Sequence, residues 1–260
     1  FFREMGCVGN HLVPLLNKGL QQQVNGGGGD LWLQILHILG HVLAASAASD
    51  LQSTQTHLGK AGILAILGEG VVHGNMGAAS CAAGLRLLSL LVNRHSPNRL
   101  LLSQLRAQTG PGVLNAIMQL ATSDTPADSS HEVNMAAALV FKCYLGGNVD
   151  GQQHIAASFM PQPSFDDEPD MPAAEETIGR MLISALVNVG DGNLPSVWGA
   201  STVFCSVLAA NSVCQEIAVA TPLELPMSEA PPEMFMTSLL AALSRQKEES
   251  DMRMTALVLK

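Results

Sequence analysis

Aromatic and charged side chains are both scarce in this chain of 260 residues. Only 4% of the residues are Phe, Trp or Tyr and only 13% are charged, whereas 47% are hydrophobic. Low charge combined with high hydrophobicity excludes a globally disordered chain. A folded chain of this length buries about three quarters of the surface that it exposes when unfolded, so a core without disulfides or metals is expected.

Basic residues and long apolar runs are also lacking. The chain has 13 Lys and Arg against 22 Asp and Glu, which gives a formal net charge of −9. A nucleic-acid-binding domain normally carries a basic stripe, so we expect no nucleic-acid partner. The strongest apolar run, Met135 to Phe141, ends at Lys142 and is far shorter than the about 20 residues that span a bilayer. We therefore expect no direct membrane insertion.

Cysteine ligand motifs and targeting segments are absent. The five cysteines (Cys7, Cys81, Cys143, Cys205 and Cys214) are an odd number and are widely spaced. No CxxC pair occurs, so we predict buried, reduced thiols in a cytosolic protein. The chain begins without a basic and then apolar signal pattern and ends inside an apolar helical pattern. We interpret it as a slice of a longer chain.

Helical periodicity dominates what is present. Between Leu31 and Leu43, and again between Thr177 and Val189, apolar residues recur three and four apart, as on one buried face of a helix. Alternating strand patterns do not persist, so the sequence predicts an all-α fold. The residues predicted to form the core are Trp32, Leu36, Phe141, Ile178, Trp198 and Phe204.

The same order of parts recurs along the chain. Short segments near Phe2, Leu58, Leu102, Ile155 and Ile217 alternate with long apolar helices that start near Leu31, Ala78, Glu132, Pro195 and Ser250. The spacing of roughly 45–60 residues is at or above that of armadillo and HEAT units. We predict one domain over 1–260, an armadillo-like helical-repeat solenoid, a right-handed superhelix of about five units. The alternative is an irregular helical domain.

The glycine-rich stretches do not match a nucleotide-binding motif. Gly68 to Gly74 has its third glycine one position late for GxGxxG and lacks a βαβ context, so we predict a loop between two helices. Gly26 to Gly29 lacks the Lys-Ser/Thr of a phosphate loop and is predicted to be a linker. We expect no cofactor.

The titratable residues do not form a convincing catalytic or metal-binding set. His37 and His41 lie four apart, but a zinc site needs further ligands and usually a Glu between such histidines. The acids Asp166, Asp167, Glu168 and Asp170 lie in a proline-rich loop between Pro161 and Pro172, where carboxylates are solvated rather than fixed. We predict no enzyme activity, no metal site, and at most a docking point for a basic partner in this loop.

Several short stretches occur in a set order along the whole chain: Phe1-Phe2-Arg3-Glu4, Leu12 to Leu16, Phe141 to Leu145, Asn148, Gly151-Gln152, Gly179 to Leu182, Trp198 to Ala200, Leu208 and Asn211. In order and spacing they resemble the globular head of the general vesicular transport factor family of Golgi vesicle tethers. The Phe-Phe-Arg-Glu start and the Asn-x-x-Gly-Gln turn are the strongest of these. Gly26 to Gly29 and Thr221 to Pro232 depart from the family pattern.

The resemblance implies an armadillo-like head that functions in vesicle-mediated ER-to-Golgi and intra-Golgi transport. Such a head docks vesicles before SNARE-mediated membrane fusion. The implied partners are a Rab-family GTPase, golgins and SNARE proteins, and the implied homodimer forms through a coiled coil outside this chain. The implied location is cytoplasmic, peripheral on the cytosolic face of Golgi membranes and transport vesicles.

A generic armadillo-type adaptor that binds peptide or protein partners is the alternative function. Peptide-binding grooves of nuclear import receptors resemble ladders of Trp and Asn at W-x-x-x-N spacing. Four residues after Trp32 is Leu36, and four after Trp198 is Thr202, so the ladder is absent. The sequence therefore favours the tether over the adaptor.

Overall fold

The computed structural model describes residues 8–25, 31–72, 77–106, 112–123, 130–161, 176–187, 194–224 and 231–244. Over these ranges the chain is all-helical and has no strand beyond two isolated bridges, Arg106 with Gly112 and Pro222 with Met234. The all-α prediction is confirmed. The helices are η1 (Val8–Leu12), α2 (Val13–Val24), α3 (Leu31–Ala45), α4 (Ala48–Lys60), α5 (Ile63–Val72), α6 (Ala78–Val92), α7 (Ser96–Gln104), α8 (Val113–Thr122), α9 (Ser130–Leu145), α10 (Val149–Ala157), α11 (Ile178–Val187), α12 (Leu194–Leu208) and α13 (Ser212–Ala220), followed by helical residues 235–244.

Long, short and third helices alternate in a fixed order. The long helices α3, α6, α9 and α12 have 15 or 16 residues each and begin within two positions of the predicted starts. Each is followed by a shorter helix (α4, α7, α10 or α13) and then by a third helix (α5, α8, α11 or residues 235–244). The predicted short segments at Leu58, Leu102, Ile155 and Ile217 lie in these shorter helices. Phe2 and Ser250 lie outside the described residues.

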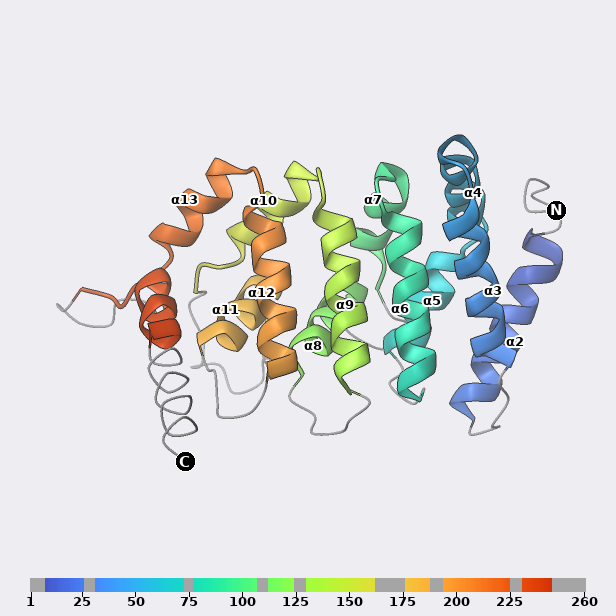
Figure 1. The fold of residues 1–260 in the computed structure, drawn as a ribbon, viewed down its shortest axis with the longest axis horizontal. Coiled ribbons are helices and arrows are strands. Elements are labelled where there is room, and N and C mark those ends of the chain that lie inside the picture. Colours follow the sequence, from blue (N-terminus) through green and yellow to red (C-terminus); the bar gives the residue numbers. More distant parts are fainter. Residues whose placement is uncertain are drawn as a thin grey trace, which may run out of the picture.

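Equivalent helices pack side by side. Helix α3 contacts α6, α6 contacts α9, and α9 contacts α12, while α5 contacts α8 and α8 contacts α11. The long helices therefore stand in chain order along the longest axis of the molecule (Figure 1). The long helices form one row, and the third helices α5, α8 and α11 form a second row. Because an amphipathic helix must bury its apolar stripe, the two rows bury each other's apolar side.

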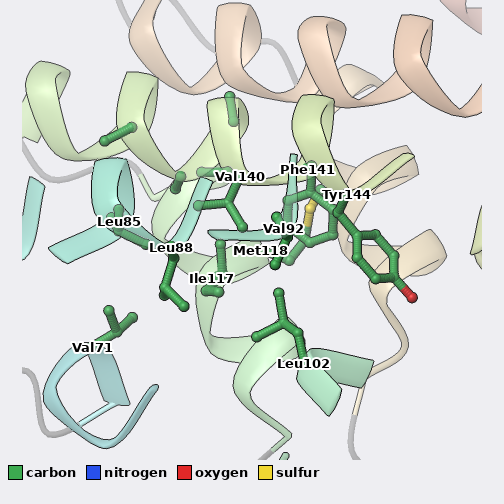
Figure 2. Packing of buried hydrophobic residues seen from close by; sticks show 14 of the residues in the cluster. Val71, Leu85, Leu88, Val92, Leu102, Ile117, Met118, Val140, Phe141 and Tyr144 are labelled. Atoms are coloured by element: carbon green, nitrogen blue, oxygen red, sulfur yellow. The ribbon is translucent and has the colours of Figure 1, made fainter. Parts of the chain in front are cut away.

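The core fills the space between the two rows. Figure 2 shows Leu88 and Val92 of α6, Ile117 and Met118 of α8, and Phe141 of α9 converging on one another. Among the predicted core residues, Trp32, Leu36, Phe141 and Phe204 are buried, and Ile178 is half-buried against the same cluster.

The prediction that Trp198 belongs to the core is wrong. Its side chain is 46% exposed, whereas Ala200, Phe204 and Val207 on the same helix are buried. Trp198 precedes Ala200 by two residues, and at 3.6 residues per turn this places it about 200° around the helix. The size of the side chain suggested burial, but the helical phase directs it outward.

Two further predictions fail in detail. Gly68 and Gly70 are not loop residues, because they lie within α5 and are buried. A side chain at Gly68 would meet Val113 of α8 at 3.0 Å, so this glycine permits close packing of the two helices. Among the cysteines, Cys81 and Cys214 are buried, Cys143 is partly buried and Cys205 is exposed, so burial is not general. All four are free thiols, and Cys7 lies outside the described residues.

Candidate functional site

The turn between a long helix and the next short helix is built in the same way three times. One residue in each turn adopts a left-handed conformation: Arg94 (φ 53°), Gly147 (φ 70°) and Ala210 (φ 53°). Non-glycine residues adopt this conformation at a steric cost, so its recurrence at Arg94 and Ala210 reflects a requirement of the turn. The pairs α6–α7, α9–α10 and α12–α13 are therefore joined by turns with the same backbone feature.

The residue after each left-handed position caps the following helix with its side chain. Asn148 Oδ1 accepts a hydrogen bond from the Gly151 N–H at 3.3 Å, and the same contact recurs from the Asn98 N–H to His95 Nδ1 and from the Cys214 N–H to Asn211 Oδ1. Side chains that satisfy the free N–H groups of the first turn favour helix initiation. His95, Asn148 and Asn211 therefore hold equivalent positions.

A buried polar side chain on each of the first three short helices reaches the next long helix. Arg99 Nη2 donates to the carbonyls of Cys143 and Gly146, both at 2.8 Å. Gln152 Nε2 donates to the carbonyls of Ser206 and Ala209 at 2.9 and 3.0 Å. Gln55 Nε2 donates to the carbonyls of Leu90 and Asn93 at 2.7 and 3.1 Å. We call Gln55, Arg99 and Gln152 the clamp residues.

The carbonyls that accept these bonds are equivalent to one another. Cys143 and Gly146 precede the cap residue Asn148 as Ser206 and Ala209 precede Asn211, and as Leu90 and Asn93 precede His95. The last carbonyls of a helix lack intrahelical partners, so the clamp residues satisfy groups that would otherwise be orphaned. We call a long helix, the short helix after it and the third helix that follows one unit. Each clamp thus joins the short helix of one unit to the end of the long helix in the next unit.

The Asn-x-x-Gly-Gln turn singled out in the sequence forms one such joint. Asn148 is the cap, Gln152 is the clamp, and Gln152 Oε1 also accepts a hydrogen bond from Asn211 Nδ2 at 3.1 Å. Gly151 is buried, and a side chain there would lie 3.2 Å from Tyr144 Cε1. These motif residues have a clear packing role. The other motif residues, Phe1, Phe2, Arg3 and Glu4, lie outside the described residues.

Two titratable groups, His95 and Arg99, are buried at the start of α7. His95 is held by the Asn98 N–H at Nδ1 and lies 3.0 Å from Thr56 Oγ1 through Nε2. Because Nδ1 accepts, the neutral ring carries its proton on Nε2. Burial, and secondarily the charge of Arg99, lower the pKa of His95. Burial also lowers the pKa of Arg99, against the opposing influence of Cys143 and Tyr144.

Helices α6, α9 and α12 are neighbours, and each exposes side chains to solvent. We call the exposed side of these three helices the long-helix face. It includes Arg86 on α6, Glu132, Met135, Leu139 and Lys142 on α9, and Trp198 and Cys205 on α12, with Thr202 half-buried beside them. Arg86 and Glu132 form an ion pair at 3.8 Å across the two helices. The face exposes one large aromatic side chain, Trp198, and two other apolar side chains, Met135 and Leu139, which are not packed into the hydrophobic core.

The other candidate residues do not converge. His37 and His41 are both exposed on α3, and the part of the chain that the structure describes contains no group of three metal-ligating side chains. Asp166, Asp167, Glu168, Asp170, and Gly26 to Gly29, lie outside the described residues. Sequence reasoning missed Arg99 as a clamp and the long-helix face. The available signal for the clamp was Arg99 directly before the apolar run Leu100 to Leu102. The available signal for the long-helix face was the helical phase of Trp198.

Comparisons with known proteins do not assign this chain to a family. No protein-family model matches it, and no curated protein matches it with significant similarity. None of the helices that the structure describes combines the length and the apolar character needed to cross a bilayer. A functional proposal therefore depends on the joints, the long-helix face and the resemblance carried by the sequence.

Proposed function

We propose that this chain is an armadillo-like helical-repeat solenoid, a right-handed superhelix in one domain, and that it is a non-enzymatic scaffold for protein–protein interactions. Two recurring features carry the proposal: a left-handed turn with a capping side chain joins a long helix to the following short helix three times, and a clamp joins a short helix to the next long helix three times. Units of this size cannot bury their own apolar face, and stacking supplies the core. Stacked repeats also present extended surfaces suited to protein partners.

The resemblance in sequence supports a specific use of the scaffold. We infer that it is the head of a vesicle tether that is recruited by a Rab-family GTPase and contacts golgins and SNARE proteins. Its place would be the cytosolic face of Golgi membranes and transport vesicles, where dimerisation occurs through a coiled coil outside this chain. The packing role of Asn148, Gly151 and Gln152 agrees with this inference without requiring it.

A titration tests the tether. The 260-residue chain is titrated with a Golgi Rab-family GTPase loaded either with a GTP analogue or with GDP, and binding is followed by calorimetry. Binding that is selective for the GTP state is the expected result, because tethers are recruited by active GTPases. Absence of binding by a chain with native helical content and a cooperative melt would reject the tether and leave a helical scaffold.

A generic adaptor is the second candidate, and the exposed Trp198 favours it. Armadillo-type adaptors present tryptophan on their long helices, and Trp198 lies on the long-helix face rather than in the core. The missing Asn four residues later still argues against import-receptor chemistry, since that position is Thr202. Micromolar binding of a basic import-signal peptide would select the adaptor.

A further inference from the structure

We propose that the long-helix face at Met135, Leu139, Lys142 and Trp198 binds an acidic peptide segment of a partner protein, one that carries apolar anchor side chains. The inference rests on the proposed function as an interaction scaffold, because it names the chemistry of the partner and the surface that receives it.

The apolar residues of this surface lie at matching heights on neighbouring helices. Helices α9 and α12 are in contact and run side by side (Figure 1). Their ends are equivalent, since Leu145 and Leu208 each accept a hydrogen bond from the backbone N–H of the cap residue, Asn148 or Asn211. Counting back from these ends, Met135 aligns with Trp198 and Lys142 with Cys205. Packed helices are about 8–10 Å apart, so Met135 and Trp198 form one patch.

The patch is apolar and accessible. Trp198 is 46% exposed, Met135 40% and Leu139 39%. Leu139 follows Met135 by one helical turn, so it lies on the same side of α9. Tryptophan is among the residues that contribute most to protein–protein binding when a partner covers it. Contiguous exposed apolar residues with a polar rim are typical of an interaction site.

The charge of this surface differs from that of the rest of the chain. Helices α6, α9 and α12 contain one acidic residue, Glu132, of the 22 in the chain, together with Arg86 and Lys142. Arg86 is paired with Glu132, whereas no acidic side chain among the described residues forms an ion pair with Lys142. Lys142 beside an apolar patch favours a partner that supplies both acidic and apolar side chains, and this local attraction acts against the general repulsion from a chain of net charge −9.

Two other exposed apolar residues lie away from the long-helix face. Leu100 on α7 and Val219 on α13 are each more exposed than Trp198. Helices α7 and α13 belong to the row of shorter helices and not to the long-helix face. Single exposed apolar residues are common on protein surfaces and need no ligand. Val219 therefore provides a matched control.

The test uses the 260-residue chain and two short fluorescein-labelled peptides. One peptide has leucine and phenylalanine anchors separated by glutamates, and the other has lysine in place of every glutamate. Fluorescence anisotropy measures binding of each peptide to the wild-type chain and to three variants. The variants are Trp198→Ala, Lys142→Glu and the control Val219→Ala, all at exposed positions where folding is little affected.

The expected result is saturable binding of the acidic peptide and weaker binding of the basic one. Trp198→Ala should weaken binding of the acidic peptide about tenfold or more. Lys142→Glu should reverse the preference between the peptides, and Val219→Ala should leave both affinities unchanged. Equal binding of the two peptides, no binding of the acidic peptide, or an unchanged affinity in Trp198→Ala would each overturn the inference.

The outcome is separable from that of the GTPase titration. Acidic-peptide binding through Trp198 without GTPase binding would keep this inference and reject the tether. GTPase binding without acidic-peptide binding would keep the tether and reject this surface as an acidic-peptide site. A preference for the basic peptide would reject the inference and favour the import-type adaptor.

Discussion

At the scale of single residues, the cap of each short helix combines a common geometry with different chemistry. Asn148 and Asn211 use an amide oxygen, whereas His95 uses a ring nitrogen that accepts only when the ring is neutral. A positive charge on His95 would remove the cap and would lie at the N-terminus of α7, where the helix dipole disfavours cations. This difference makes one joint sensitive to pH.

We predict that the stability of the chain decreases on acidification through His95. Its pKa in the folded protein is lowered from 6.5, so protonation favours the unfolded state. The contribution is complete above about pH 6.5 and is lost as the pH falls below that value towards the folded pKa. Urea unfolding from pH 8 to pH 5 measures it. His95→Asn, which imitates Asn148, should retain the cap and flatten this dependence. An unchanged pH dependence in His95→Asn would contradict the assignment.

Truncation should destabilise the protein far more at Phe204 than at Trp198, although the two residues lie on the same helix. The Phe204 ring is buried and packs against Phe235 edge-on, with centroids 5.5 Å apart, and against Phe159 at 6.1 Å. Phe204→Ala should lower the free energy of unfolding by about 3–5 kcal/mol. Trp198→Ala should change it by only about 0.5 kcal/mol. Chemical denaturation of both variants measures the two losses of unfolding free energy. A larger loss in Trp198→Ala than in Phe204→Ala would show that the helical phase is misassigned.

At the scale of elements, the clamp residues fix how one unit sits on the next. Gln152 is buried and connects three segments: its own helix α10, the end of α12, and Asn211 at the start of α13. Gln215 holds the equivalent position one unit later, since it follows Asn211 as Gln152 follows Asn148. Gln215 is exposed and donates to the carbonyl of Leu208 in its own unit. Comparing Gln152 with Gln215 therefore distinguishes the effect of the clamp's hydrogen bonds from the effect of having a glutamine at this position.

We predict that Gln152→Ala lowers the free energy of unfolding by about 1–3 kcal/mol, because the carbonyls of Ser206 and Ala209 at the end of α12 lose a buried donor. Gln215→Ala should have an effect within about 0.5 kcal/mol. Thermal or urea denaturation of the two variants gives the comparison. Equal losses would mean that the amide contributes through helix propensity and not through the joint.

Helix type and order were predictable from sequence at this scale, whereas contacts were not. Apolar periodicity placed the starts of α3, α6, α9 and α12 correctly because long buried helices repeat the pattern over several turns. The joints were not predictable, because Arg99 lies 44 residues before its acceptor at Cys143 and no local pattern records that distance. Gly68 and Gly70 were assigned to a loop because glycine is a weak helix former, but tight packing against α8 overrides that propensity.

At the scale of the whole molecule, the joints place the long helices side by side and in chain order. Helix α3 neighbours α6, α6 neighbours α9, and α9 neighbours α12. Side chains at the same height on neighbouring long helices therefore lie beside one another, as Met135 and Trp198 do in the proposed patch. The proposed scaffold function depends on this order, since an extended partner needs a continuous face.

Distances between spin labels on the long helices test this order most directly. Labels are introduced through an unnatural amino acid at the exposed positions Ile38, Arg86 and Trp198, so that the native cysteines remain. Each step between neighbouring helices adds about 8–10 Å. We predict roughly 20 Å between Arg86 and Trp198, and roughly 30 Å between Ile38 and Trp198. Similar distances for the two pairs would contradict a side-by-side stack and indicate an irregular helical domain.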